Sequence, residues 1–190
     1  MKSNRNDAFQ DKSIKVPFVV PNIDNSDKKA VITALESNLL TGGPTLRKFE
    51  NSFRDLTGSK YAIGVSNATA ALQLSLKSLK IGKDDEVIIP DMTFVATANA
   101  VLFTGATPIL ADINFEDLNI SVESIKKNMS SKTKAIIPVH FAGKSCNMKE
   151  IRKIAKQYHV KIIEDCAHAV GTKFGHTHVG NFGEAGCFSF

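Results

Sequence analysis

The sequence has no tryptophan, and only two tyrosines and three cysteines occur among its 190 residues. Because Trp and Tyr are scarce, base stacking on aromatic side chains has little support, and we expect no nucleic-acid partner. Cys146, Cys166 and Cys187 are odd in number and show no C-x-x-C spacing. This pattern argues against a disulfide framework or a zinc site and favours a reducing, cytoplasmic environment.

Long apolar runs are also missing. No run approaches the roughly 18 residues that a membrane-spanning helix needs, and residues 1–7 lack the apolar stretch of a signal peptide. We therefore expect a cytoplasmic protein without a membrane partner. The 24 Lys and Arg residues against 19 Asp and Glu residues give a net charge of +5, spread along the chain. Such a mild excess suits an anionic small molecule as well as nucleic acid.

Nucleotide-binding glycine motifs are absent too: the chain contains neither G-x-G-x-x-G nor a P-loop G-K-[ST]. Residues 1–15 are polar and predict a flexible leader. The pattern after them predicts two helices, from Ser26 to Leu39 and from Pro44 to before Gly58. Alternating strands and helices then follow, which predicts a parallel sheet between two helical layers, an α/β three-layer sandwich. The expected strands are 61–65, 86–90, 107–111, 134–139 and 160–165, and the expected helices are 68–79, 94–103, 121–129 and 147–158.

The last part of the chain has a different pattern. Residues 171–180 predict two short strands around a turn. Residues 187–190 read as part of a core strand, so we expect this chain to be a piece of a longer protein. His176 and His178 would share a face of such a strand, but without a third ligand they favour a polar hairpin tip over a metal site. Cys166 beside His168 is a weak pattern for a thiolate nucleophile.

Ligands of parallel α/β sheets bind outside the carboxyl ends of the strands. The segment 65–72 passes from a predicted strand through small residues into a helix. The N–H groups at the start of that helix, with the hydroxyls of Ser66 and Thr69, could bind an anion. The alternative is that these two hydroxyls only cap the helix.

Three further side chains follow predicted strands or lie in one. Asp165 ends a buried strand, where it could hold a cationic ligand group with His168 nearby, or could cap a turn. Phe94 could stack on a flat ring or fill the core. Ser189, between two phenylalanines, could donate to a phosphate or bond a neighbouring carbonyl.

Together these segments resemble the DegT/DnrJ/EryC1/StrS family of pyridoxal-phosphate-dependent aminotransferases that act on nucleotide-linked keto sugars. The resemblance runs from about Lys15 to Phe190. It rests on six motifs in the family's order: Leu40–Thr45, Gly64–Leu72, Asp91–Asn99, Lys134–His140, Glu164–Ala169 and Gly186–Phe190.

The resemblance implies the fold-type-I aminotransferase large domain, with a mostly parallel sheet, over residues 16–190, and a homodimer. The small C-terminal domain would be absent from this chain. Ala68, Thr69 and Ser189 would hold the phosphate of pyridoxal 5'-phosphate. Phe94 would stack on the ring, Asp165 would pair with the ring nitrogen, and His168 would stand near the phenolic oxygen. Asp165 and His168 would be the catalytic residues of this part of the chain.

The family's Schiff-base lysine follows the Phe-Ser-Phe strand by a few residues, so it would lie beyond Phe190. The resemblance implies amino transfer to a keto sugar, with glutamate as the donor, for polysaccharide or glycoconjugate synthesis. Relatives that remove a 3-hydroxyl carry histidine in place of that lysine. A sugar 3-dehydratase therefore stays open, as does a non-catalytic regulatory module with the cofactor fold.

Overall fold

The computed structural model describes residues 20–190. The predicted leader, residues 1–15, lies outside this range. The chain divides into two compact units with a boundary between Thr45 and Leu46. The first contains α1 (Asn25–Leu35) and the start of α2 (Gly43–Thr57). Asp24 caps α1, because its carboxylate accepts the backbone N–H groups of Ser26 and Asp27 at 2.7 and 3.0 Å.

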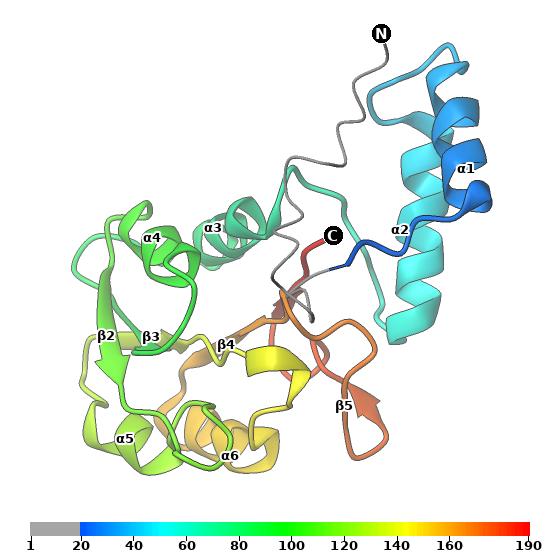
Figure 1. The fold of residues 1–190 in the computed structure, drawn as a ribbon. Helices are drawn as coiled ribbons and strands as arrows, with labels where there is room; N and C mark the ends of the chain where they lie inside the picture. The colour runs from blue at the N-terminus through cyan, green and yellow to red at the C-terminus, as the bar shows by residue number, and fades with distance from the viewer. Residues whose placement is uncertain (1–19) are drawn as a thin grey trace, which may run out of the picture. The chain divides into compact units, whose positions relative to one another are not determined.

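A five-stranded sheet forms the centre of the second unit, in the order β2-β1-β3-β4-β7 (Figure 1). Every neighbouring pair is parallel. The strands are β1 (Glu86–Pro90), β2 (Thr107–Ala111), β3 (Thr133–Ile136), β4 (Lys161–Asp165) and β7 (Ala185–Cys187). The predicted strands 86–90 and 107–111 are thus confirmed. The predicted hairpin is also confirmed, as the antiparallel pair β5 (Lys173–Phe174) and β6 (Thr177–His178).

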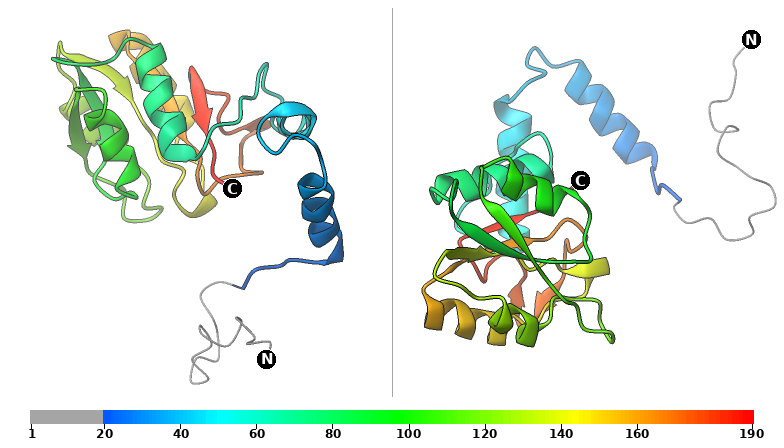
Figure 2. Two further views of the ribbon diagram at one scale, coloured as in Figure 1. Left: turned by 90° about the horizontal axis from the view of Figure 1, so that it is seen from above. Right: turned by 90° about the vertical axis from the view of Figure 1, so that its left-hand side faces the viewer.

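Helices cover both faces of the sheet, as the three-layer prediction requires (Figure 2). They are α3 (Ala68–Ser78), α4 (Ala96–Leu102), α5 (Val122–Lys127) and α6 (Met148–Tyr158), with a short 3-10 turn at Phe141–Gly143. Successive side chains of a strand point to opposite faces. Val87 and Ile89 of β1 accordingly pack under α3 and α4, whereas Ile88 packs against α5 and α6.

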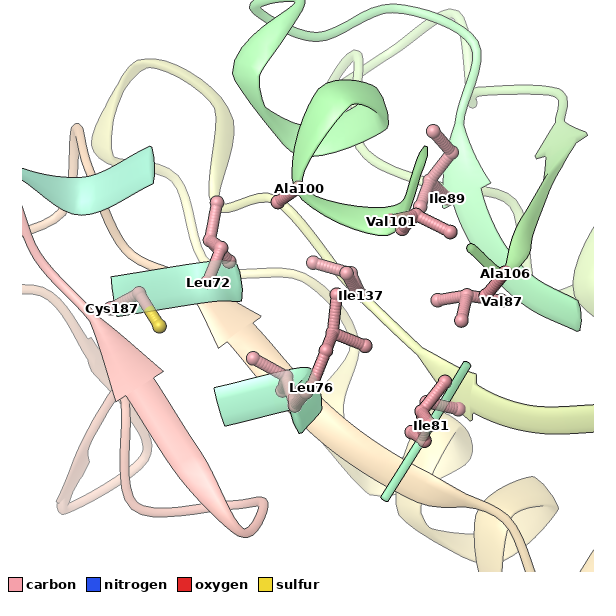
Figure 3. Close-up of a cluster of buried hydrophobic side chains, with 12 residues drawn as sticks. Leu72, Leu76, Ile81, Val87, Ile89, Ala100, Val101, Ala106, Ile137 and Cys187 are labelled. Atoms are coloured by element: carbon pink, nitrogen blue, oxygen red, sulfur yellow. The ribbon is translucent and has the colours of Figure 1, made fainter. Parts of the chain in front are cut away.

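The layer between the sheet and α3 and α4 is drawn in Figure 3. Leu72, one turn into α3, lies beside Cys187 of β7, while Ile81, beyond the other end of the helix, lies by β1 and β3. Helix α3 therefore runs antiparallel to the strands, and its first residues lie at the edge where the strands end. This arrangement brings the start of α3 to the edge at which ligands of such sheets bind.

Two predicted strands differ from the structure. Residues 61–65 form no strand, and Ile63 is 81% exposed. Within residues 20–190 this segment has no strand partner, and without one an apolar run cannot form a ladder. The predicted strand 134–139 is shorter: β3 ends at Ile136, and a single bridge joins Val139 to Asp165. Pro138 interrupts the ladder between them because it has no N–H to donate.

No helix in the described part of the chain is both long enough and apolar enough to cross a bilayer.

Candidate cofactor-binding site at the carboxyl edge of the sheet

Asp165 is the last residue of β4 and is buried, with 5% of its surface exposed. Its two carboxylate oxygens have different partners. Oδ2 accepts the hydroxyl of Thr97 on α4 at 2.8 Å, and Oδ1 accepts the backbone N–H of Ala167 at 3.2 Å. Each oxygen of a carboxylate can accept about two hydrogen bonds, so both retain capacity for a ligand. A buried carboxylate held in this way can bind a cationic group.

The start of α3 provides a second polar feature at this edge. Asn67 caps the helix, and its side chain accepts the backbone N–H of Ala70 at 2.9 Å. The cap is therefore neither Ser66 nor Thr69, the two residues for which capping was the alternative. Within residues 20–190 the backbone N–H groups of Ala68 and Thr69 have no acceptor. Free N–H groups and the helix dipole make this terminus suitable for a phosphate.

Asp165 and the start of α3 are on the same face of the sheet. Asp165 is opposite Cys187 in the ladder, and the Sγ atom of Cys187 lies 3.6 Å from the Oγ atom of Ser75 on α3. Residues opposite one another in a ladder point to the same face. The carboxylate and the free amides therefore occupy one face and one edge, which suits a ligand with a cation at one end and an anion at the other.

Ser189 lies beside a cleft of about 770 Å³, which Ser66 and Asn67 also line. Ser189 is an exposed residue, and no hydrogen bond from its hydroxyl to a neighbouring carbonyl is found among the described residues. Ser189 and the segment just before α3 thus line the same cleft. The structure does not bring all predicted site residues into this cleft: Ala68, Thr69, Phe94, Asp165 and His168 are not among its lining residues.

Phe94 and His168 are both exposed. Phe94 is 73% exposed in the turn between β1 and α4, so the core-filling alternative does not hold in this chain. The predicted helix 94–103 begins later, at Ala96, which leaves Phe94 outside it. His168 follows β4, and its ring meets that of Phe141 edge-on with 6.0 Å between the centroids. Both residues follow strand ends, where a bound ring could reach them.

The three cysteines are buried and unpaired with one another. Burial is the main cause that raises the pKa of the Cys166 thiol well above its ordinary value, and the nearby carboxylates of Glu164 and Asp165 raise it further. Burial likewise raises the pKa of Cys187 to about 12. Because the thiolate is the nucleophile, the interpretation of Cys166 as a catalytic nucleophile loses its support.

One cluster of metal-ligating residue types occurs among the described residues, formed by His140, Glu164 and Cys166, whose ligand atoms lie within 4.8 Å of one another. The side chain of Glu164 accepts hydrogen bonds from Nε2 of His140 and from the backbone of the loop 180–183, while Nδ1 of His140 accepts the N–H of Cys146. These bonds use the side-chain polar atoms of His140 and Glu164, two of its three members, so we assign the cluster a structural role.

The histidines of the hairpin separate in the structure. His176 is exposed at the turn, but His178 is buried, so the prediction of a polar tip is wrong for His178. Its Nε2 atom accepts the backbone N–H of Gly171 at 3.0 Å, and its Nδ1 atom lies 2.6 Å from the carbonyl oxygen of Val179. His178 therefore connects the hairpin to the segment before it.

Two residues at the site were not predicted from the sequence, namely Thr97 and Asn67. A threonine among alanines in a short apolar helix after a buried strand is a signal that could have identified Thr97. Asn67 directly precedes the predicted helix, and Asn is among the preferred N-cap residues.

The mostly parallel sheet, flanked by helices on both faces, is the fold of the large domain of fold-type-I aminotransferases. Comparison with known proteins gives the family. The model of the DegT/DnrJ/EryC1/StrS aminotransferase family matches residues 21–190, and the chain belongs to this family.

Similar proteins include the spore coat polysaccharide biosynthesis protein SpsC of Bacillus subtilis, 41% identical over 92% of this chain and 45% of SpsC. Among solved structures, the aminotransferase of Psychrobacter cryohalolentis is 39% identical with a TM-score of 0.87, covering 92% of this chain and 45% of that chain. Helicobacter pylori PseC, an aminotransferase involved in the biosynthesis of pseudoaminic acid, is 36% identical with a TM-score of 0.84, covering 90% and 46%. The chain spans less than half the length of these relatives.

Proposed function

We propose that the whole protein is a pyridoxal-phosphate-dependent aminotransferase. It would transfer an amino group, with glutamate as the donor, to a keto group of a nucleotide-linked sugar, for polysaccharide or glycoconjugate synthesis. Membership of the family and the names of the similar proteins support this proposal. The family description and the names of two of these proteins, the Psychrobacter cryohalolentis enzyme and PseC, describe aminotransferases and so favour amino transfer over the sugar dehydratase and the regulatory module.

The observation that carries the proposal is the buried carboxylate of Asp165 on the same face and edge as the free amides at the start of α3. These residues fit the two ends of pyridoxal phosphate. Asp165 would hold the protonated ring nitrogen, while the N–H groups of Ala68 and Thr69 and the hydroxyl of Ser189 would bind the phosphate. Phe94 would cover one face of the ring, and His168 would contact its phenolic oxygen.

When bound, the cofactor would supply an electron sink for the carbon that loses its proton. The residues of this chain would bind and orient it. Asp165 favours a proton on the ring nitrogen because an opposite charge stabilises the charged form of a neighbour. The amides at the start of α3 anchor the phosphate without a charged side chain, since the helix dipole is positive there.

The remaining partners are part of the same proposal. A nucleotide-linked sugar carries a diphosphate, which the net charge of +5 suits. We further propose a cytoplasmic homodimer, as the resemblance to the family implies.

A binding experiment on the full-length gene product tests the proposal. Pyridoxal phosphate is titrated into the protein, and its absorbance and dissociation constant are measured for the wild type and for Asp165→Asn. A hydrogen bond to a charged group contributes about 1.5–3 kcal/mol, so the Asn variant should bind the cofactor roughly 10- to 150-fold more weakly. Asp112→Asn is the matched control, because Asp112 lies directly after β2 at the same end of the sheet but is exposed.

Function is tested with the same protein. In the absence of a sugar, wild-type protein with pyridoxal phosphate should convert about one equivalent of glutamate per bound cofactor to 2-oxoglutarate, because the amino group would then remain on the cofactor. A protein that binds no pyridoxal phosphate, or an Asp165→Asn variant with wild-type affinity, contradicts the cofactor assignment. If the protein binds the cofactor but releases no 2-oxoglutarate, only the glutamate-dependent amino transfer is contradicted, and the cofactor assignment stands.

A further inference from the structure

Thr97 is fully buried in α4, and its hydroxyl does not make the hydrogen bond that is usual for a threonine in a helix. Buried threonines in helices commonly donate to the carbonyl oxygen three or four residues earlier. Thr57, the buried last residue of α2, does so to the carbonyl of Phe53 at 2.9 Å, and Thr104, in the turn after α4, donates in the same way to the carbonyl of Val101 at 2.7 Å. Thr97 instead donates across 68 residues of sequence to Oδ2 of Asp165 at 2.8 Å.

A second threonine extends this contact. The hydroxyl oxygens of Thr93 and Thr97 lie 2.9 Å apart. A hydroxyl has one proton, and an ionised carboxylate can only accept. Because the proton of Thr97 goes to Asp165, the proton of Thr93 must point to the oxygen of Thr97. The two hydrogen bonds therefore run in one direction: Thr93 donates to Thr97, and Thr97 donates to Asp165. We call this pair of bonds the hydroxyl chain.

The carboxylate is held from both sides. Thr97 holds Oδ2, and the backbone N–H of Ala167 holds Oδ1 at 3.2 Å. Two donors on different oxygens fix the plane of the carboxylate, and so they fix the direction in which its remaining lone pairs point. Thr93 is also next to Phe94 in the turn after β1. The hydroxyl chain thus connects the turn that carries Phe94 with Asp165.

We propose that Thr97 is a positioning residue that orients Asp165 toward the ring nitrogen of pyridoxal phosphate, with Thr93 supporting it. The proposal rests on the cofactor site proposed above. Thr97 contacts the carboxylate and not the cofactor, so its effect on binding passes through the ring nitrogen. A merely structural threonine would affect every ligand of the site alike.

The test uses the full-length gene product and two ligands, pyridoxal phosphate and its 1-deaza analogue, in which a C–H group replaces the ring nitrogen. Thr97→Val keeps the shape of the side chain and removes the donor, whereas Thr97→Ser keeps the donor. Thr104→Val is the control, because it removes a threonine hydroxyl whose bonds are to nearby backbone, the carbonyl oxygen of Val101 and the N–H of Ala106. Dissociation constants are measured for both ligands at one pH.

We expect Thr97→Val to weaken the binding of pyridoxal phosphate roughly tenfold and that of the deaza analogue by about twofold or less. Thr97→Ser should restore the affinity for pyridoxal phosphate, and Thr104→Val should change neither constant. Equal weakening of both ligands by Thr97→Val, or no weakening of either, would overturn the proposal.

Asp165→Asn separates this proposal from the cofactor assignment. If Asp165→Asn weakens pyridoxal phosphate and Thr97→Val does not, only the positioning role fails. If Asp165→Asn also has no effect, the cofactor assignment fails with it. If Thr97→Val does not fold, the dissociation constants of Thr93→Val decide the question. A loss of affinity for pyridoxal phosphate alone, smaller than that expected for Thr97→Val, supports the proposal. Unchanged affinities, or an equal loss for both ligands, contradict it.

Discussion

The Oε2 atom of Glu164 lies 3.1 Å from Nε2 of His140, and both side chains are fully buried. Nδ1 of His140 accepts the backbone N–H of Cys146 at 3.1 Å, so the ring proton is on Nε2 and points to the carboxylate. Glu164 also accepts three backbone N–H groups at 2.6–3.0 Å, those of Gly180, Phe182 and Gly183. This single side chain connects the segment after β3 with the loop that leads into β7.

Glu164→Gln should strongly destabilise the protein. Glutamine has one acceptor oxygen where the carboxylate has two, so at least one buried N–H group is left facing an NH₂ group. A buried N–H group left without its acceptor costs about 1–3 kcal/mol, and more where the acceptor was charged. The free energy of unfolding, measured with urea on the full-length protein, gives the value. Exposed Glu116→Gln is the control, with an expected change below about 0.5 kcal/mol. Equal stability of the two variants would rule out the structural role of Glu164.

Gly183→Ala tests the same loop by steric overlap. A Cβ atom on Gly183 would overlap the carbonyl group of Ile162, with 2.8 Å to its carbonyl carbon. The obstacle is backbone of β4, which cannot move aside as a flexible side chain does, and any shift of Gly183 lengthens its bond to Glu164. We expect a loss of about 3 kcal/mol in the free energy of unfolding.

Gly171→Ala is the comparison for that experiment. No atom lies within 4 Å of its added Cβ, but Gly171 has φ of +84°, so alanine there is strained without a clash. We expect a loss of about 1–2 kcal/mol in urea unfolding. If Gly171→Ala were the more damaging of the two, the close approach of Gly183 to β4 would not be a constraint.

The local pattern of the sequence predicts some elements well and others poorly, for a physical reason. The strands at 86–90 and 107–111 are short apolar runs between turns, and both form as predicted. The segment 61–65 has a similar apolar pattern but no strand partner among the described residues. Whether a strand forms depends on a neighbour far away in sequence, which a local pattern does not contain.

The same distinction applies to the site. Asp165 is recognisable from the sequence as a carboxylate at the end of a buried strand. Its contact with Thr97, and that of Glu164 with His140, join residues 68 and 24 positions apart. Residue types and spacing identify a polar side chain in an apolar segment, but they do not say which distant group will satisfy it.

The cysteines should not react with thiol reagents in the folded protein. The pKa of Cys187 is raised to about 12, mainly by burial, so at pH 8 roughly one thiol in 10,000 is ionised. Iodoacetamide labelling at pH 8, followed by mass spectrometry of the peptides, measures this. In guanidinium chloride all three cysteines of this chain should be labelled. Rapid labelling of Cys166 in the native protein would reinstate it as a candidate nucleophile.

The cap of α3 gives the last prediction. Asn67→Ala removes the side-chain acceptor of the Ala70 N–H group, and loss of an N-cap costs about 1 kcal/mol. Ser66→Ala should leave the free energy of unfolding nearly unchanged, because the Ser66 hydroxyl makes only a long bond of 3.4 Å, with the side chain of Asn67. Urea unfolding of the two variants compares them directly. If Ser66→Ala were the more destabilising, the helix would be capped by Ser66 after all.

The Asn67→Ala variant also tests the phosphate site at the start of α3. A bound phosphate supplies acceptor oxygens at the helix terminus, where the substitution has removed the acceptor of the cap. Saturating inorganic phosphate should therefore reduce the stability difference between Asn67→Ala and the wild type.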